Sequence, residues 1–250
     1  MTDWPAGFEK RILESTDSTM SEATRLLPDL TAPTWILAKR QTAGRGRQGK
    51  AWVDPVGNFA ATLVMLPKGP PANVALRSFV AALALREALV GLTGREAAFT
   101  LKWPNDVLLN GGKLAGILLE SVGQGSGVSH LSIGVGVNLM SAPDQVKGAA
   151  FAPVSLRAET GVTVQPETFL DSLAPAYARF ESQFNTYGFA PIRQKWLSYA
   201  ARLGEVITAK TAKNQITGTF QTVDESGALV LKDGGGSHAI AAADIFFAKV

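Results

Sequence analysis

Hydrophobic positions in the first third of the chain alternate between short strand-like runs and helical segments. Apolar, partly β-branched runs at 34–40 and 59–66 predict strands. A helix is expected from Met20 to Leu27, because Thr16-Asp17-Ser18-Thr19 supplies residues that cap helix N-termini. A longer helix is predicted over 71–92, which opens on proline and is apolar nearly all round, so it is expected to be buried.

The middle of the chain reads as a series of strands. Extended runs are predicted at 99–103, 106–109 and 113–122, and a further strand at 130–139. Asn110-Gly111-Gly112 separates the second and third runs, and this pattern favours a tight β-hairpin. Strands mixed with helices in this way predict an α+β protein whose mixed sheet is flanked by helices.

The pattern changes near residue 204. Helices are predicted at 166–187, with an interruption or kink at Pro175, and at 190–201. Beyond Gly204 the chain shows β-branched alternation, and turns are expected at 224–227 and 233–236. We therefore expect a catalytic domain over 1–203 and a separate small β-barrel over 204–250.

Composition narrows the class of protein. The 250 residues are 46% hydrophobic and 18% charged, with no apolar run of membrane length and no leader-like segment, so a cytoplasmic protein is expected. The chain has no cysteine and two histidines, His130 and His238, which argues against thiol catalysis, a Ser-His-Asp triad and a zinc site. The net charge of +3 comes from dispersed basic residues, so neither nucleic acid nor membrane binding is expected.

A glycine-rich basic loop follows the first predicted strand. Gly44-Arg45-Gly46-Arg47-Gln48-Gly49-Lys50 nominally satisfies two phosphate-binding motifs, but each motif also requires a following helix. Here Ala51 replaces the Ser or Thr of a P-loop, and Pro55 and Gly57 soon follow. The segment is either a solvated basic turn or a loop that wraps an anion when one is bound.

A second polar cluster ends the strand at 99–103. In Lys102-Trp103-Pro104-Asn105-Asp106, the proline stops the strand and places a cation, an amide and a carboxylate at the end of the sheet. If the hairpin forms, Asp106 and Lys113 lie close together across it, either as a surface salt bridge or as part of a site. Gly116 would allow a ligand to approach the backbone closely.

These segments together resemble the biotin protein ligases, which are related in fold to class II aminoacyl-tRNA synthetases and lipoate ligases. The resemblance rests on matching stretches in the same order and spacing, which are Asp17-Ser18-Thr19, Gln41 to Trp52, Lys102 to Asp106, Lys113 to Glu120 and Gly134 to Asn138. It also implies that the C-terminal barrel is of the SH3-like kind. Met20 and Gln48 differ from residues that are frequent in the family, which are Asn and a basic residue.

The resemblance implies a set of site residues. Biotin is expected to contact Ser18, Thr19, Gln41, Arg45, Gly46, Arg47, Lys113 and Gly116. ATP or the adenylate is expected to contact Arg47, Trp52, Lys102, Asn105 and Asn138. Arg45, Lys113 and Asp106 are the expected catalytic residues, with Asp106 acting as base or positioner for the attacking amine.

The resemblance also implies the reaction and its partners. Biotin and ATP, with Mg²⁺, would form biotinyl-5′-AMP, and biotin would then pass to the acceptor lysine of a biotin carboxyl carrier protein. No helix-turn-helix domain is seen ahead of Phe8, so a repressor role is not expected. A homodimer is left open, and the alternative functions are a lipoate or octanoate ligase and a non-catalytic biotin-sensing protein.

Overall fold

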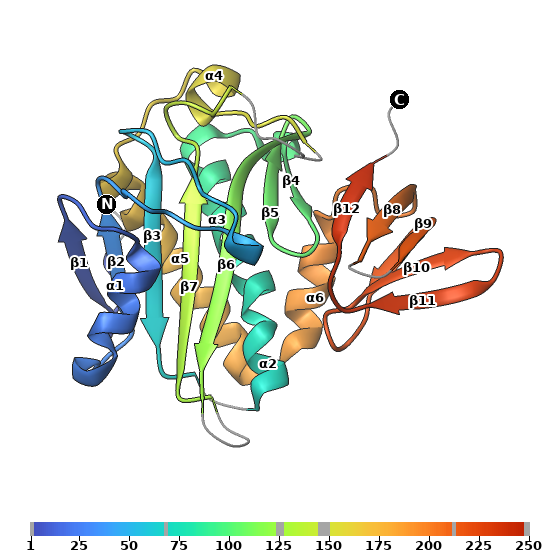
Figure 1. Ribbon diagram of the computed structural model, residues 1–250, viewed down its shortest axis with the longest axis horizontal. Helices are drawn as coiled ribbons and strands as arrows, with labels where there is room; N and C mark the ends of the chain where they lie inside the picture. The colour runs from blue at the N-terminus through green and yellow to red at the C-terminus, as the bar shows by residue number, and fades with distance from the viewer. Residues whose placement is uncertain (1–2, 68–69, 124–127, 145–150, 212–213, 248–250) are drawn as a thin grey trace.

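The computed structural model describes residues 3–67, 70–123, 128–144, 151–211 and 214–247. In these segments the chain forms one large mixed sheet with helices on both faces and a second, smaller sheet at its C-terminal end (Figure 1). This confirms the predicted α+β class.

The large sheet has seven strands in the order β1-β2-β3-β7-β6-β5-β4. Their bounds are β1 Glu9–Leu13, β2 Thr34–Ala38, β3 Phe59–Met65, β4 Phe99–Lys102, β5 Asp106–Leu109, β6 Gly112–Val122 and β7 His130–Val137. Among these strands as the structure describes them, β1 and β2 pair in parallel and the other neighbours pair antiparallel. The strand β1 was not predicted. The prediction of a tight hairpin at Asn110 is confirmed, since Asn110 and Gly111 have the positive φ values of such a turn, 50° and 82°.

Helices cover the two faces of this sheet unequally (Figure 1). Among the α-helices of the described segments, α1 (Thr19–Leu26) is the one on the front face, where Ser18 caps it by accepting a hydrogen bond from Met20 N. The helices α3 (Arg77–Thr93) and α5 (Pro166–Tyr187) pack on the other face. The shorter helices are α2 Pro71–Ala75, α4 Leu156–Thr160 and α6 Phe189–Ser198.

Two details differ from the sequence prediction. The helix expected over 71–92 is divided at Leu76 into α2 and α3. The helix α5 is continuous through Pro175 and is not interrupted there. Its neighbours Leu173, Ala174 and Ala176 are buried, so packing of this face outweighs the loss of one backbone hydrogen bond.

Alternation along the strands separates two hydrophobic layers. Side chains such as Trp35, Leu63 and Ile133 belong to the main core with α3 and α5. Their neighbours Ile36 and Val64 point to the opposite face and pack against Ala23 and Leu26 of α1, in a small separate cluster. Because α1 is short, the rest of this face is available for a pocket.

The C-terminal sheet is antiparallel, with the order β11-β10-β9-β8-β12. Its strands are β8 Val206–Lys210, β9 Gln215–Val223, β10 Leu229–Asp233, β11 Gly236–Ile240 and β12 Asp244–Phe247. Its buried residues belong to the same cluster as the main core. The turn between β9 and β10 contacts the turn that joins β4 to β5, since Trp103 Nε1 donates a hydrogen bond of 2.9 Å to Gly227 O.

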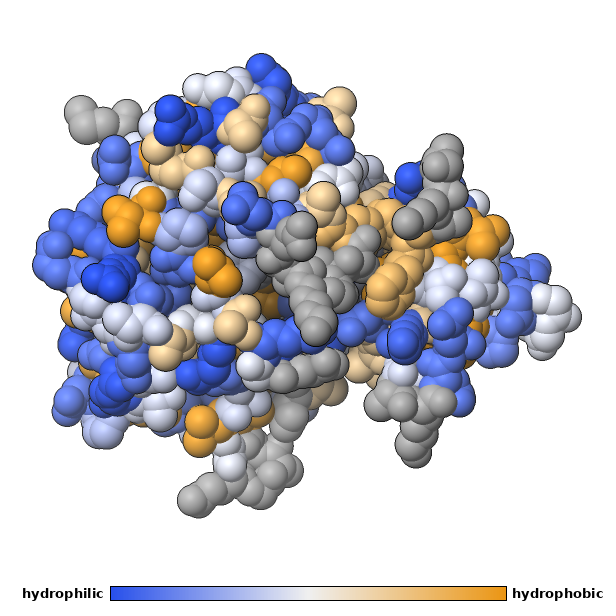
Figure 2. Space-filling view, turned by 45° about the horizontal axis from the view of Figure 1, so that its top comes forward, coloured by the Kyte–Doolittle hydropathy of each residue, from blue (hydrophilic) through white to orange (hydrophobic). Residues whose placement is uncertain are grey.

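The surface is mixed in character. On the face shown in Figure 2, hydrophobic side chains are scattered among hydrophilic ones over the larger part of the molecule. In the described part of the chain, none of the helices has the length and apolar character needed to cross a membrane.

Candidate functional site

A cavity of about 400 Å³ opens on the sheet face that carries α1. The side chains around it come from α1, the glycine-rich loop and strands β3, β5, β6 and β7. Among them are almost all the residues predicted from the sequence, which are Ser18, Thr19, Gln41, Arg45, Gly46, Arg47, Trp52, Asn105, Asp106, Lys113, Gly116 and Asn138. The exception is Lys102, which does not line the cavity.

The floor of the cavity is one row of positions across the sheet. Strand register pairs Asp106 with Gly116, Gly116 with Gly136, and Gly136 with Ala60. Small residues in the middle of this row leave room for Trp52, which lies directly on them. A Cβ atom at Gly136 would be 2.5 Å from Trp52 Cε2, and one at Gly116 would be 3.4 Å from Trp52 Cζ3.

At the other end of the cavity, polar groups from α1 and the loop form a fixed network. Gln41 Oε1 accepts hydrogen bonds from Thr19 N at 2.9 Å and Thr19 Oγ1 at 3.2 Å. Thr62 Oγ1 donates to Thr19 Oγ1 at 2.8 Å from the sheet below. This end therefore presents hydroxyl and amide groups in set positions, which suits a small polar, uncharged ligand group.

Two residues that sequence reasoning left unassigned shape this end. The buried Met20 side chain packs on Gly134, where a Cβ atom would lie 2.9 Å from Met20 Sδ. Asp54 Oδ2 accepts a hydrogen bond of 3.4 Å from Gln41 Nε2, so it orients the Gln41 amide with its oxygen toward Thr19. Burial raises the pKa of Asp54, and the donors of Gln41 oppose that shift.

A chain of charges crosses the hairpin between β5 and β6. Asp106 is buried, and its two oxygens lie 2.7 Å from Lys113 Nζ and 3.0 Å from Lys102 Nζ. Burial alone would raise the pKa of Asp106, but the two ammonium groups outweigh it and keep the pKa below its ordinary value. Lys102 is only 7% exposed and lies opposite Asp106 in the strand register, so it extends the same row of positions onto β4. Lys102 thus reaches the site through Asp106, and its predicted contact with ATP stays a prediction.

The glycine-rich loop is a small hairpin over the cavity. Gly46 N donates to Lys50 O at 2.7 Å, Trp52 N donates to Gly44 O at 2.9 Å, and Arg47–Gly49 forms a single 3-10 turn at the tip. The Gln48 side chain lies outside the described residues. This hairpin replaces the helix N-terminus that both phosphate motifs would require.

The three cations of this loop have different partners. Arg45 pairs with Glu120 and Ser21, and Lys50 lies 3.6 Å from Asp244 of β12. Arg47 instead donates a long hydrogen bond of 3.4 Å to Asn105 Oδ1. Arg47 is therefore the loop cation that is best placed to bind an anion in the cavity.

Two asparagines fix the remaining wall. Asn105 Nδ2 donates to Ile117 O, and Asn138 Nδ2 donates to Val154 O at 3.1 Å. Sequence reasoning missed three acidic residues that act on the site, which are Asp54, Glu120 and Asp244. Glu120 stood at the end of a matching stretch, but its pairing with Arg45, 75 residues away, has no local signal.

Comparisons with known proteins identify the family. Residues 11–138 match the model of the "Biotin/lipoate A/B protein ligase family", and residues 203–248 match the "Biotin protein ligase C terminal domain". The chain is 55% identical over 238 residues to a biotin–acetyl-CoA-carboxylase ligase of Paracoccus denitrificans, covering 94% of this chain and 99% of that protein. It is 31% identical to the bifunctional ligase/repressor BirA of Bacillus subtilis, covering 94% and 71% respectively.

A solved structure agrees with this relationship. The biotin protein ligase from Aquifex aeolicus in complex with biotin and ATP superimposes with a TM-score of 0.80 at 26% identity, covering 95% of this chain and 97% of that one. The large sheet and the C-terminal sheet therefore belong to a fold that the two proteins share. This chain is a member of the biotin protein ligase family.

Proposed function

We propose that this chain is an ATP-dependent ligase that joins biotin to ATP as biotinyl-5′-AMP and then passes biotin to a lysine of a biotin carboxyl carrier protein. The observation that carries the proposal is a single cavity with two chemically different ends. One end offers Ser18, Thr19 and Gln41 to a polar, uncharged group, and the other gathers Arg47 and Lys113. Biotin has a ureido group at one end and a carboxylate at the other, which matches this arrangement.

The first half-reaction brings two anions together. A carboxylate must attack the α-phosphate of ATP with loss of pyrophosphate, and the repulsion between them must be offset. Arg47 and Lys113 are the cations placed for this task, and ATP is expected to enter as its Mg²⁺ complex. Trp52, Asn105 and Asn138 surround the space left for the adenosine part.

The second half-reaction needs a deprotonated amine near the acyl carbon. Asp106 is held below its ordinary pKa by Lys102 and Lys113, so it is a weak base at neutral pH. We therefore assign it the role of positioner, which the buried pairing with Lys102 supports. A smaller cavity of about 270 Å³, lined by Trp103, Asn105 and Gly227 among others, shares Arg47 and Asn105 with the main one and offers a route for the acceptor lysine.

The test is biotin-dependent exchange of radiolabelled pyrophosphate into ATP by the purified protein. Exchange with biotin and none with lipoate or octanoate is expected. Exchange with lipoate alone would establish the lipoate ligase instead. Binding of biotin without any exchange, in the presence of Mg²⁺, would establish the non-catalytic sensor.

A further inference from the structure

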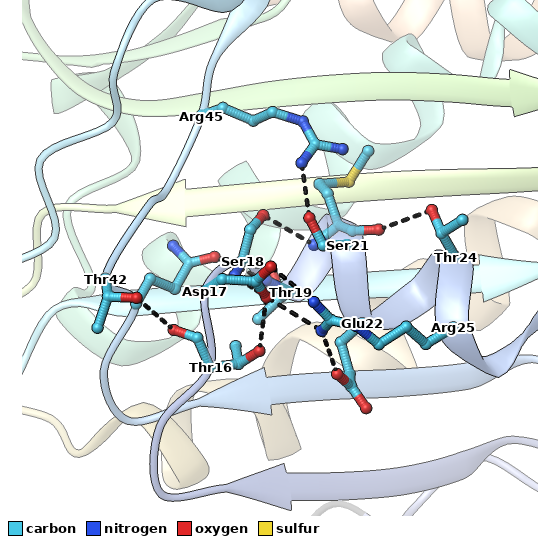
Figure 3. A network of polar contacts seen from close by, with 12 residues as sticks. Thr16, Asp17, Ser18, Thr19, Ser21, Glu22, Thr24, Arg25, Thr42 and Arg45 are labelled. Atoms are coloured by element: carbon cyan, nitrogen blue, oxygen red, sulfur yellow. Dashed lines mark hydrogen bonds and ion pairs between the residues drawn. The ribbon is translucent and has the colours of Figure 1, made fainter.

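The guanidinium of Arg45 is hydrogen-bonded to other side chains of the protein. Its Nε and Nη2 donate to the two oxygens of Glu120 on β6, at 3.2 and 2.9 Å. Its Nη1 donates to Ser21 Oγ on α1 at 2.9 Å, as Figure 3 shows. A fork of two parallel bonds to a carboxylate is the strongest geometry available to a guanidinium. An anion in the cavity would have to compete with Glu120 for it.

The position of Arg45 in its loop explains what this contact does. Arg45 forms a β-bridge with Ala51 at the base of the loop hairpin. The hydrogen bond from Gly46 N to Lys50 O follows one residue later, toward the tip. The contact therefore joins three elements that border the cavity, which are the hairpin, β6 and α1. Ser21 lies directly after Thr19 and Met20, whose side chains form the cavity wall.

Its neighbour Arg47 has the opposite arrangement. Arg47 is at the tip of the same hairpin, where it donates the 3.4 Å hydrogen bond to Asn105. The two arginines were expected to act together on anions. In the structure Arg45 is held by Glu120 and Ser21, whereas Arg47 faces the cavity.

We propose that Glu120 is a positioning residue which, through Arg45, anchors the glycine-rich hairpin over the cavity, and that the Arg45 side chain serves as this anchor and not as a contact for the reacting anions. The inference rests on the proposed function. A loop with three glycines has much conformational freedom to lose, so a fixed base lowers the cost of ordering its tip over the intermediate. Glu120 would then govern how long the adenylate is retained.

The test uses a charge exchange. Arg45→Glu and Glu120→Arg each place like charges together, and each should speed release of preformed biotinyl-adenylate about tenfold and raise the KM for biotin. The double variant R45E/E120R restores the pair in reverse and should return both quantities to within about threefold of the parent. If Arg45 contacts the anions, the double variant will be as defective as Arg45→Glu alone, and the anchor is refuted.

A second readout does not depend on activity. Glu120→Gln should increase the rate of tryptic cleavage within the loop by about threefold or more, because the hairpin opens more often. Glu22→Gln is the matched control, since it removes a carboxylate one residue from Ser21 that pairs with Arg25 instead. Equal cleavage rates for Glu120→Gln and the parent would overturn the proposal. Lack of biotin-dependent exchange by the parent itself would refute the ligase function, whereas an active parent with no restoration refutes only the anchor.

Discussion

Lys113 and Asp106 form an ion pair of 2.7 Å across the hairpin that joins β5 to β6. Lys113 is about one-third exposed and faces the cavity, whereas Asp106 is buried and holds Lys102 with its other oxygen. The orientation of the exposed lysine thus depends on a buried carboxylate. This arrangement makes the role of Asp106 testable through the two half-reactions.

Asp106→Asn should slow transfer to the carrier more than it slows formation of the adenylate. The amide keeps the shape and its oxygen can still accept a hydrogen bond from Lys113, so activation continues, but it removes the charge that is proposed to position the attacking amine and that pairs with Lys102. Leaving Lys102 without a buried counter-charge should also cost about 3 kcal/mol of stability. Pyrophosphate exchange and single-turnover transfer from preformed adenylate measure the two steps. Equal losses in both would reject the positioning role in transfer.

The same variant should leave the pH profile of transfer unmoved. The pKa of Asp106 is lower in the folded protein than in the unfolded chain, where it is about 3.9. The ionised carboxylate therefore stabilises the fold at pH values above about 3.9, and this stabilisation is lost only as the pH falls through the lower pKa of the folded protein. Asp106 is thus ionised across the neutral range. A shift in the acid limb of the transfer rate in Asp106→Asn would show that it acts as the base.

Asp54→Asn should raise the melting temperature, and by more at pH 7 than at pH 4. Burial raises the pKa of Asp54, so the folded state favours the protonated carboxyl and loses stability as pH rises through that pKa. The asparagine removes this penalty and still offers an oxygen to Gln41 Nε2. Thermal unfolding at the two pH values is the measurement. A lower melting temperature at pH 7 would contradict the argument.

Gly136→Ala should weaken ATP binding while the protein stays folded. The new methyl group would lie 2.5 Å from Trp52, so the indole must leave the cavity floor. We expect the KM for ATP to rise roughly tenfold, the equivalent of one lost contact of about 1.4 kcal/mol. Gly116→Ala is the matched comparison, since its methyl group would sit at 3.4 Å and should have the smaller effect. Similar KM values for the two variants would show that Trp52 does not contact ATP.

Arg47→Gly should release the adenylate early while activation continues. Loss of one charge-assisted hydrogen bond of about 1.5 to 3 kcal/mol predicts roughly ten- to a hundredfold faster escape. Biotin labelling of a bystander protein such as albumin reports the escape, and Arg47→Lys, which keeps the charge, should fall between the variant and the parent. An unlabelled bystander would show that Arg47 makes no contact with the intermediate.

Trp103→Phe should reduce stability and slow transfer together. It removes the hydrogen bond to Gly227, which ties the C-terminal sheet to the segment that leads into Asn105 and Asp106. A loss of about 1 to 3 kcal/mol is expected in denaturant unfolding. Trp35→Phe is the control, because among the described residues the buried Trp35 Nε1 has no hydrogen-bond partner. Comparable transfer rates in the two variants would exclude a role for this contact.

The sequence predicted most elements because their signals are local. The Asn110 hairpin, the capped start of α1 and the apolar α3 each depend on residues within a few positions of one another. The strand β1 was missed because Glu9, Lys10 and Arg11 give it no apolar alternation. It forms as an exposed edge that pairs with the buried β2.

The site residues also divide into those with a local sequence signal and those placed only by the fold. Ser18, Gln41 and Lys113 stood in recognisable motifs, and the cavity brings them together. Asp54, Glu120 and Asp244 act through contacts that only the fold creates. The predicted contact of Lys102 with ATP stays a prediction, since its side chain pairs with Asp106 and does not itself line the cavity. The boundary at 203 stays a prediction, since one continuous core spans both sheets.

The row of Asp106, Gly116, Gly136 and Ala60 has a consequence for how this protein can change over evolution. Successive residues of a strand face opposite sides, so an insertion or deletion of one residue in β6 would turn the cavity floor into core and bring core residues such as Ala115 to the ligand. Ligand preference can therefore drift through the loops and α1, where side chains are exchanged one at a time. The lengths of the central strands cannot change by one residue without losing the pocket and the core together.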